Sequence, residues 1–255
     1  METFVRERIS ILLRNPVLVE GFPGLGYVGK IAVTYLARQL GAMRLAELYS
    51  PYFPFHVITN RGGGIRLPRA QFYYYLDRER PFDLVFCTSD SQAQSLEGQF
   101  DVVDKILAYA RNLGAQTIVA IGGYSGACEE ERPICVATSK ELLKKMLDCG
   151  AVLGPLGNPI VGLAGVTLGM AKLARMDAAC ILGRTVGHLP DPDSAKNVLE
   201  VLQRFLGVSI NMEPLDKEIE RANRIFKNME NVQKEMEKAT KDEFEPGSGK
   251  ITYIS

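Results

Sequence analysis

The chain has 255 residues, of which 46% are hydrophobic, so it is long enough to bury one substantial core. Its 30 basic and 30 acidic residues cancel, which argues against a partner dominated by phosphates, such as DNA, because the bulk composition supplies no basic footprint. A local basic patch remains compatible with this balance.

The N-terminal segment does not have the basic and then apolar layout of a signal peptide, because charged residues interrupt positions 6 to 14. The longest weakly polar stretch, 152–171, is broken by prolines and glycines and therefore reads as buried loop, strand and helix rather than as a membrane span. We expect a soluble, cytoplasmic protein.

Short apolar runs and helical patterns alternate through the first half of the chain. Strands are predicted over 16–21, 43–48, 55–59, 72–76 and 84–88, the fourth because aromatic residues favour strands. Apolar residues at helical spacing predict helices over 31–40 and 92–113, and Gly114 follows the second where a C-terminal cap belongs.

The alternation continues in the second half. We predict strands over 117–121 and 178–182 and a helix over 140–147. Another helix begins near Asp191 and runs to Phe205, because an early proline and acidic residues favour a helix start. Strands separated by helices predict an α/β core domain over 1–210, with a mostly parallel sheet flanked by helices.

The tail has a different pattern. Residues 211–244 predict an amphipathic helix whose apolar seam comprises Leu215, Ile219, Ala222, Phe226, Met229, Val232 and Met236. This helix either packs on its own domain or projects and pairs with another subunit. Residues 245–255 read as a flexible tail with an apolar end, which suggests a partner.

A glycine-rich loop follows the first predicted strand and is the first candidate for chemistry. It comprises Gly21, Phe22, Pro23, Gly24, Gly26 and Gly29 and contains a literal G-x-G-x-x-G, with Glu47 placed where a ribose-binding acid would stand. Phe22 and Pro23 lengthen and stiffen the connection, however. Tight helix–strand packing is therefore the main interpretation, with dinucleotide binding and a cleft for a small anion or a partner residue as alternatives.

Other polar residues suggest further hypotheses, each with a structural alternative. Ser125, Asp177 and His188 stand in the order of a hydrolase triad, but Ala127 replaces the glycine of a nucleophile elbow. Asp90 is interpreted either as a carboxylate in a cleft at the sheet edge or, with Ser89 and Ser91, as a helix cap. The five cysteines form no CxxC pair, so we expect reduced thiols and neither a metal nor a cofactor.

Two segments together resemble the proteasome assembly chaperone family, particularly its archaeal members. The first is the run 16–29, from Pro16 to the last glycine of the loop, and the second is 179–185 followed by His188-Leu189-Pro190-Asp191-Pro192-Asp193. With the glycine- and proline-rich stretch 154–169 between them, the resemblance covers roughly residues 10 to 210. It implies a phosphorylase/hydrolase-like three-layer α/β fold, a homo-oligomer without a catalytic site, and ATP-independent assembly of proteasome α-subunits.

Some archaeal members of that family bind the α-ring through a terminal hydrophobic–tyrosine–any-residue motif, which the resemblance places at Tyr253, Ile254 and Ser255. This chain departs from the motif, because Tyr253 is third from the end and Ile254 takes the tyrosine position. We therefore expect a non-enzymatic, oligomeric assembly chaperone or interaction scaffold. The alternative is a small-molecule enzyme or binding protein that uses the cleft of the glycine loop for a nucleoside, a phosphate or a dinucleotide.

Overall fold

The computed structural model describes residues 1–77, 79–126, 131–155, 157–187 and 189–221. The chain divides into two units, Met1–Met212 and Glu213–Ser255. The second unit is described only over 213–221, which are helical. In the described part of the chain, no helix combines the length and the apolar character that crossing a bilayer requires.

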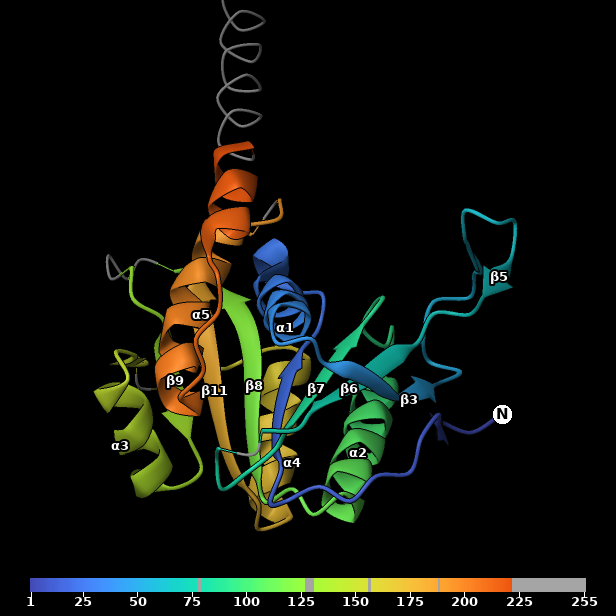
Figure 1. Ribbon diagram of the computed structural model, residues 1–255, viewed down its shortest axis with the longest axis horizontal. Helices are drawn as coiled ribbons and strands as arrows, with labels where there is room; N and C mark the ends of the chain where they lie inside the picture. The colour runs from blue at the N-terminus through green and yellow to red at the C-terminus, as the bar shows by residue number, and fades with distance from the viewer. Residues whose placement is uncertain (78, 127–130, 156, 188, 222–255) are drawn as a thin grey trace, which may run out of the picture. The chain divides into compact units, whose positions relative to one another are not determined.

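The first unit is built around one large sheet (Figure 1). Its strands are β1 (Phe4–Glu7), β2 (Val17–Gly21), β3 (Met43–Tyr49), β6 (Ala70–Tyr75), β7 (Leu84–Ser89), β8 (Thr117–Tyr124), β9 (Ile134–Ala137), β10 (Val152–Leu153) and β11 (Asp177–Arg184). A separate hairpin comprises β4 (Ile58–Thr59) and β5 (Ile65–Arg66). The helices are η1 (Leu25–Tyr27), α1 (Val28–Gln39), α2 (Leu96–Asn112), α3 (Lys140–Asp148), α4 (Leu163–Leu173) and α5 (Pro192–Leu206).

The strand order of the sheet is β1-β3-β6-β7-β2-β8-β11-β9-β10. The four central strands, β7-β2-β8-β11, are parallel, and antiparallel pairs β6–β7 and β9–β11 flank them. Every residue of β2 and β7 is buried, as expected for strands that are covered on both faces. This architecture confirms the predicted α/β fold with a mostly parallel central sheet between helices.

Helices cover both faces of the sheet (Figure 1). Helices α1 and α5 pack together on one face, and α2 and α4 pack together on the other. The α2–α4 face holds a large apolar cluster, to which α2 contributes Val102, Ile106 and Ala110 at helical spacing. The α4 stripe that faces inward comprises Leu163, Thr167 and Ala171, so a polar side chain lies between two apolar ones.

Several element predictions are confirmed and two are wrong. Helix α5 begins as predicted, because the Asp191 carboxylate accepts a hydrogen bond from the Ser194 amide over 2.9 Å. The strand predicted at 55–59 is reduced to Ile58–Thr59, and Phe55 is 98% exposed because it lies in the connection that carries the hairpin. The sequence also gave no specific prediction of β1, β9 or β10.

The predicted cap of α2 is the second error. Neither Ser89, Asp90 nor Ser91 caps this helix, because residues 90–95 form an irregular connection with bends and the helix begins only at Leu96. Ser95 is the cap, and its hydroxyl accepts a hydrogen bond from the Gly98 amide over 3.0 Å. The sequence placed the helix start too early because polar residues that favour caps occur throughout this connection.

Candidate functional site

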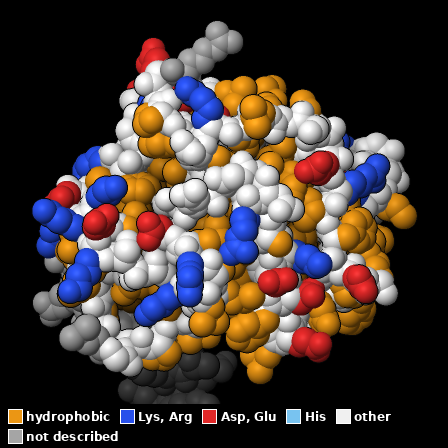
Figure 2. All heavy atoms as spheres, turned by 90° about the horizontal axis from the view of Figure 1, so that it is seen from below, with side chains coloured by type: hydrophobic (Ala, Val, Ile, Leu, Met, Phe, Trp, Pro, Cys, Tyr) orange, Lys and Arg blue, Asp and Glu red, His pale blue; other side chains and the backbone are white. Residues whose placement is uncertain are grey.

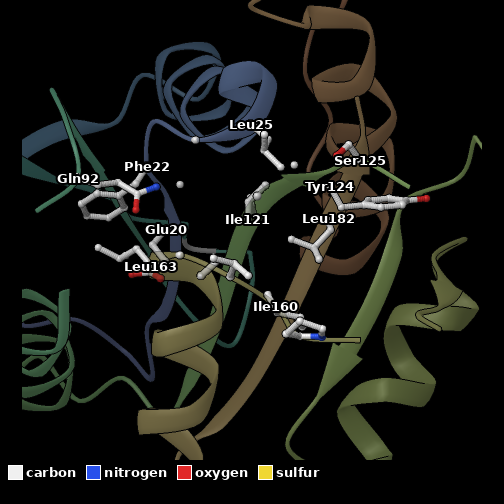
Figure 3. A pocket seen from close by; sticks show the side chains of 18 residues that line it. Glu20, Phe22, Leu25, Gln92, Ile121, Tyr124, Ser125, Ile160, Leu163 and Leu182 are labelled. Carbon is white, nitrogen blue, oxygen red and sulfur yellow. The ribbon is translucent and has the colours of Figure 1, made fainter. Parts of the chain in front are cut away.

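A pocket of about 480 Å³ opens at the carboxyl ends of β2, β8 and β11. Its walls come from the glycine-rich loop, from residues 122–125 and from the segment 159–164 that leads into α4 (Figure 3). In open α/β sheets, this edge is where ligands bind, because the loops that follow parallel strands meet there. The pocket is therefore the first place to look for a function.

Glu20 is the unusual residue of this pocket. It is 1% exposed and occupies the middle of a row that crosses the sheet on the face covered by α2 and α4. The strand register gives the row as Phe72, Cys87, Glu20, Ala120, Cys180 and Val136. A carboxylate thus replaces an apolar side chain in an otherwise apolar layer.

Neither carboxylate oxygen of Glu20 has a hydrogen-bond partner in the described structure. Its polar neighbour is Thr167 on α4, whose hydroxyl is also buried and without a partner of normal geometry. Burial raises the pKa of Glu20 from 4.5 to about 7, and the Thr167 hydroxyl opposes this shift only in part. Buried polar groups are usually satisfied, so this pair marks a site rather than a structural contact.

Two thiols are the titratable neighbours of Glu20 in its own layer. Cys87 on β7 and Cys180 on β11 are buried, and burial together with the nearby Glu20 raises the pKa of both. They therefore remain protonated thiols and supply no positive charge. None of the four cysteines in the described part of the chain forms a disulfide. The described residues also contain no cluster of metal-ligating side chains.

The remaining walls of the pocket are mainly apolar. In Figure 3, Glu20 lies between Phe22 and Leu163, and Ile121 and Leu182 line the pocket from β8 and β11. Both ends of the Gln92 amide are already hydrogen-bonded within the protein, because its nitrogen donates to the Pro23 carbonyl and its oxygen accepts from Gln99. The outer rim carries Val161, which is 86% exposed.

The glycine-rich loop is packed against the protein rather than open for a pyrophosphate. A Cβ on Gly29 would stand 2.3 Å from the Ile121 carbonyl oxygen, and one on Gly21 would stand 2.1 Å from the Gly29 oxygen. Gly26 has a positive φ of 58°, and a Cβ there would meet the Thr185 hydroxyl at 2.5 Å. Gly21 and Gly29 let α1 approach β2 and β8 closely, and Gly26 lets the loop approach Thr185, which follows β11.

Glu47 is not a ribose-binding acid, because ion pairs occupy it. Its carboxylate lies 2.7 Å from Arg69 and 2.6 Å from Arg8, and β3 is separated from β2 by β6 and β7. Burial alone would raise its pKa, but the Arg8 hydrogen bond and the Arg69 charge hold the pKa of Glu47 below its usual value. The dinucleotide hypothesis thereby loses its acidic residue.

The hydrolase triad is not assembled either. The register pairs Tyr124 with Arg184 and Thr117 with Asp177, so Ser125 and Asp177 lie at opposite ends of the β8–β11 pair. At about 3.3 Å per residue, roughly 25 Å separates them. His188 lies outside the described residues.

Asp90 lies near the same edge of the sheet but does not line the pocket. It forms an ion pair with Arg66 and accepts a hydrogen bond from the Arg69 amide over 3.1 Å. Burial alone would raise its pKa, but these contacts hold the pKa of Asp90 below its usual value. A catalytic role for this carboxylate is therefore not supported by its surroundings.

Two residues of the predicted tail surface lie in the described part of the chain. Leu215 is buried and Ile219 is half-buried in the described helix 213–221. Outside the described residues lie Ala222, Phe226, Met229, Met236, Tyr253, Ile254 and Ser255. On the face of the first unit shown in Figure 2, basic and acidic side chains occur among apolar ones, as the balanced composition predicts.

Sequence reasoning missed Glu20 and Thr167. The signal was a lone acidic residue in the apolar run 17–21. A glutamate at the end of a strand is common on a protein surface, however, so only the strand register and the covering helix α4 distinguish this one.

Comparisons with known proteins give one consistent result. A family model described as the PAC2 family matches residues 18–230. The uncharacterized protein MJ1210 of Methanocaldococcus jannaschii is 32% identical over 244 residues, which cover 95% of this chain and 93% of that protein.

Two solved structures resemble the fold along nearly their whole length. One is the crystal structure of Pyrococcus furiosus PbaB, described as an archaeal proteasome activator, with a TM-score of 0.83 and 31% identity over 90% of this chain and 99% of that one. The other is Pyrococcus furiosus PbaA, described as an archaeal homolog of proteasome-assembly chaperone, with a TM-score of 0.72 and 25% identity over 94% and 99% of the two chains.

Proposed function

We propose, from the premise that this chain belongs to the PAC2 family, that it is a non-enzymatic assembly chaperone or interaction scaffold for proteasome α-subunits. The observation that carries this proposal is the likeness to PbaA and PbaB over almost the full length of each. Both of those proteins are described by their relation to the proteasome. The protein acts in the cytoplasm, as a homo-oligomer and without ATP.

The tail supplies the contacts in this proposal. The seam of 211–244 pairs with neighbouring subunits or with the client, and the segment 246–255 reaches the α-subunits with Tyr253 and Ile254. In this proposal each contact is weak alone. Several copies displayed on one oligomer raise the effective concentration, so that weak contacts together give usable avidity.

The test is capture of purified proteasome α-subunits by the full chain and by a 1–245 truncation, measured by native mass spectrometry and analytical ultracentrifugation. We expect the truncation to keep the oligomer size of the full chain and to lose most of the captured α-subunit. The matched control is Tyr253→Ala in the full chain, which should reproduce part of the loss. Equal capture by all three proteins would refute the role of the segment 246–255.

Activation of a finished proteasome is the second candidate function, because the relative with 31% identity and a TM-score of 0.83 is described as an activator. The two functions separate in one pair of assays. An assembly chaperone accelerates formation of α-subunit rings from free subunits, whereas an activator raises peptide hydrolysis by proteasomes that are already assembled. A stimulated hydrolysis rate without any effect on assembly would favour the activator.

A further inference from the structure

We propose that the pocket at the carboxyl ends of β2, β8 and β11 binds a small organic cation, with an amidinium or ammonium group held by Glu20 and an apolar body held by the walls. This proposal does not rest on the proteasome-related function. It follows from the chemistry of the described residues that line the pocket.

The position of Glu20 is the first argument. A buried carboxylate without a partner is costly, and an apolar residue would suit its place between Cys87 and Ala120. Its polar neighbour Thr167 has a single neutral hydroxyl to offer, so no cation among the described lining residues balances the carboxylate and at least one of its oxygens has no donor. A ligand that donates hydrogen bonds would satisfy the carboxylate, which is the member of this pair that lines the pocket.

The charge of the lining residues indicates the sign of the charge on the ligand. Among the described residues that line the pocket, Glu20 is the sole ionisable carboxylate, and no Lys or Arg side chain accompanies it. A phosphate or carboxylate ligand would therefore meet a negative group and find no cation, which argues against the nucleotide and phosphate alternatives raised by the sequence. A cationic ligand would instead form an ion pair with the Glu20 carboxylate, for which the lining residues supply no positive charge.

The shape of the pocket gives the size and the body of the ligand. A volume of about 480 Å³ falls in the range of small-molecule sites, roughly 300 to 1,000 Å³. Glu20 is 1% exposed and forms the inner wall, whereas Leu25 is 46% exposed and lies at the rim. The charged group of the ligand thus enters first, and its apolar body packs against Ile121, Leu163 and Leu182.

Amidinium is the preferred head group. Its two parallel N–H groups match the two oxygens of one carboxylate, as in bidentate pairs with arginine. An ammonium group donates to the same carboxylate with less geometric constraint. The test therefore uses benzamidine together with two molecules of nearly the same shape, neutral benzamide and anionic benzoate.

Binding of these three probes is measured by isothermal titration calorimetry at pH 8, on the full-length protein. We expect benzamidine to bind at least about tenfold more tightly than benzamide, and benzoate not to bind. Glu20→Gln should remove the preference for benzamidine over benzamide. The matched control is Glu2→Gln, which changes an exposed glutamate and should bind like the wild type.

A second variant fills the pocket and keeps the carboxylate. Ala164 lines the pocket at the start of α4, so Ala164→Phe should abolish benzamidine binding while circular dichroism and oligomer size remain those of the wild type. The proposal is overturned if wild-type protein shows no preference for benzamidine. It is equally overturned if Glu20→Gln keeps the preference, or if benzoate binds as well as benzamidine.

Discussion

Replacement of Glu20 by glutamine gives the sharpest physical test of the site, because it removes one titration and changes little volume. Burial raises the pKa of this carboxyl from 4.5 to about 7, so the native state binds its proton more tightly than the unfolded state. The free energy of unfolding contributed by Glu20 therefore falls as the pH rises from about 4.5 to about 7, and it stays lowered above that range. A difference of about 2.5 pKa units corresponds to about 3 kcal/mol.

Glutamine carries no such titration, so the stability of Glu20→Gln relative to wild type should increase by about 3 kcal/mol between pH 4.5 and pH 8. The measurement is urea denaturation of both proteins at pH 4.5, 5.5, 6.5, 7.5 and 8, without added ligand. Glu2→Gln serves as the control for loss of an exposed carboxylate. A difference between Glu20→Gln and wild type that stays constant with pH would refute the reasoning, because it would mean that Glu20 is ionised throughout or has a partner.

Four further predictions concern the pocket, one glycine each in α1 and α4, and the buried ion pair. Benzamidine affinity should fall about tenfold from pH 8 to pH 6 as the pocket carboxylate becomes protonated, and calorimetry in which the affinity stays constant would contradict this. Gly29→Ala should lower the free energy of unfolding by more than about 2 kcal/mol, because its Cβ would stand 2.3 Å from the Ile121 carbonyl oxygen. Gly169→Ala, in α4 with open space around the new Cβ, should instead raise it by up to about 1 kcal/mol in the same urea titration. Arg69→Met should cost about 2 kcal/mol, since it leaves the buried Glu47 with one fewer cation, and unchanged thermal and urea midpoints would show that Arg8 alone suffices.

The parts of the fold that could be predicted from sequence are those with a strong local signal. Strands β2 and β7 are buried along their whole length and consist mostly of apolar residues, as parallel strands covered on both faces require. The start of α5 carries an aspartate cap and an early proline. In each case, the residues that form the element also specify its type.

The elements whose bounds could not be predicted lack such a signal. Helix α4 begins at Leu163 after Gly162, which supplies no side-chain cap, and it contains two glycines, so the sequence indicates a helix within 152–171 without giving its bounds. Strand β10 has two residues and depends on pairing with β9. Tertiary contacts decide both elements, and a single sequence does not contain those contacts.

The candidate site also combines a feature with a local sequence signal and a feature that depends on tertiary contacts. The glycine loop was visible as a motif, and close packing of α1 on β2 and β8 agrees with its interpretation as a tight helix–strand connection. The apolar surroundings of Glu20 could not be predicted from the sequence, because they depend on the register of five residues on neighbouring strands and on the position of Thr167. An acidic residue becomes informative only when its neighbours are known to be apolar.

The tail and the pocket are different parts of the chain, so the two proposals can fail separately and can also be tested for coupling. If an occupied pocket and a bound α-subunit favour the same conformation, benzamidine must raise the affinity for the α-subunit by the same factor by which the α-subunit raises the affinity for benzamidine. Glu20→Gln should abolish that factor and keep the basal capture. A factor of one in both directions would show two independent binding functions on one scaffold, because a ligand with equal affinity for two states shifts neither.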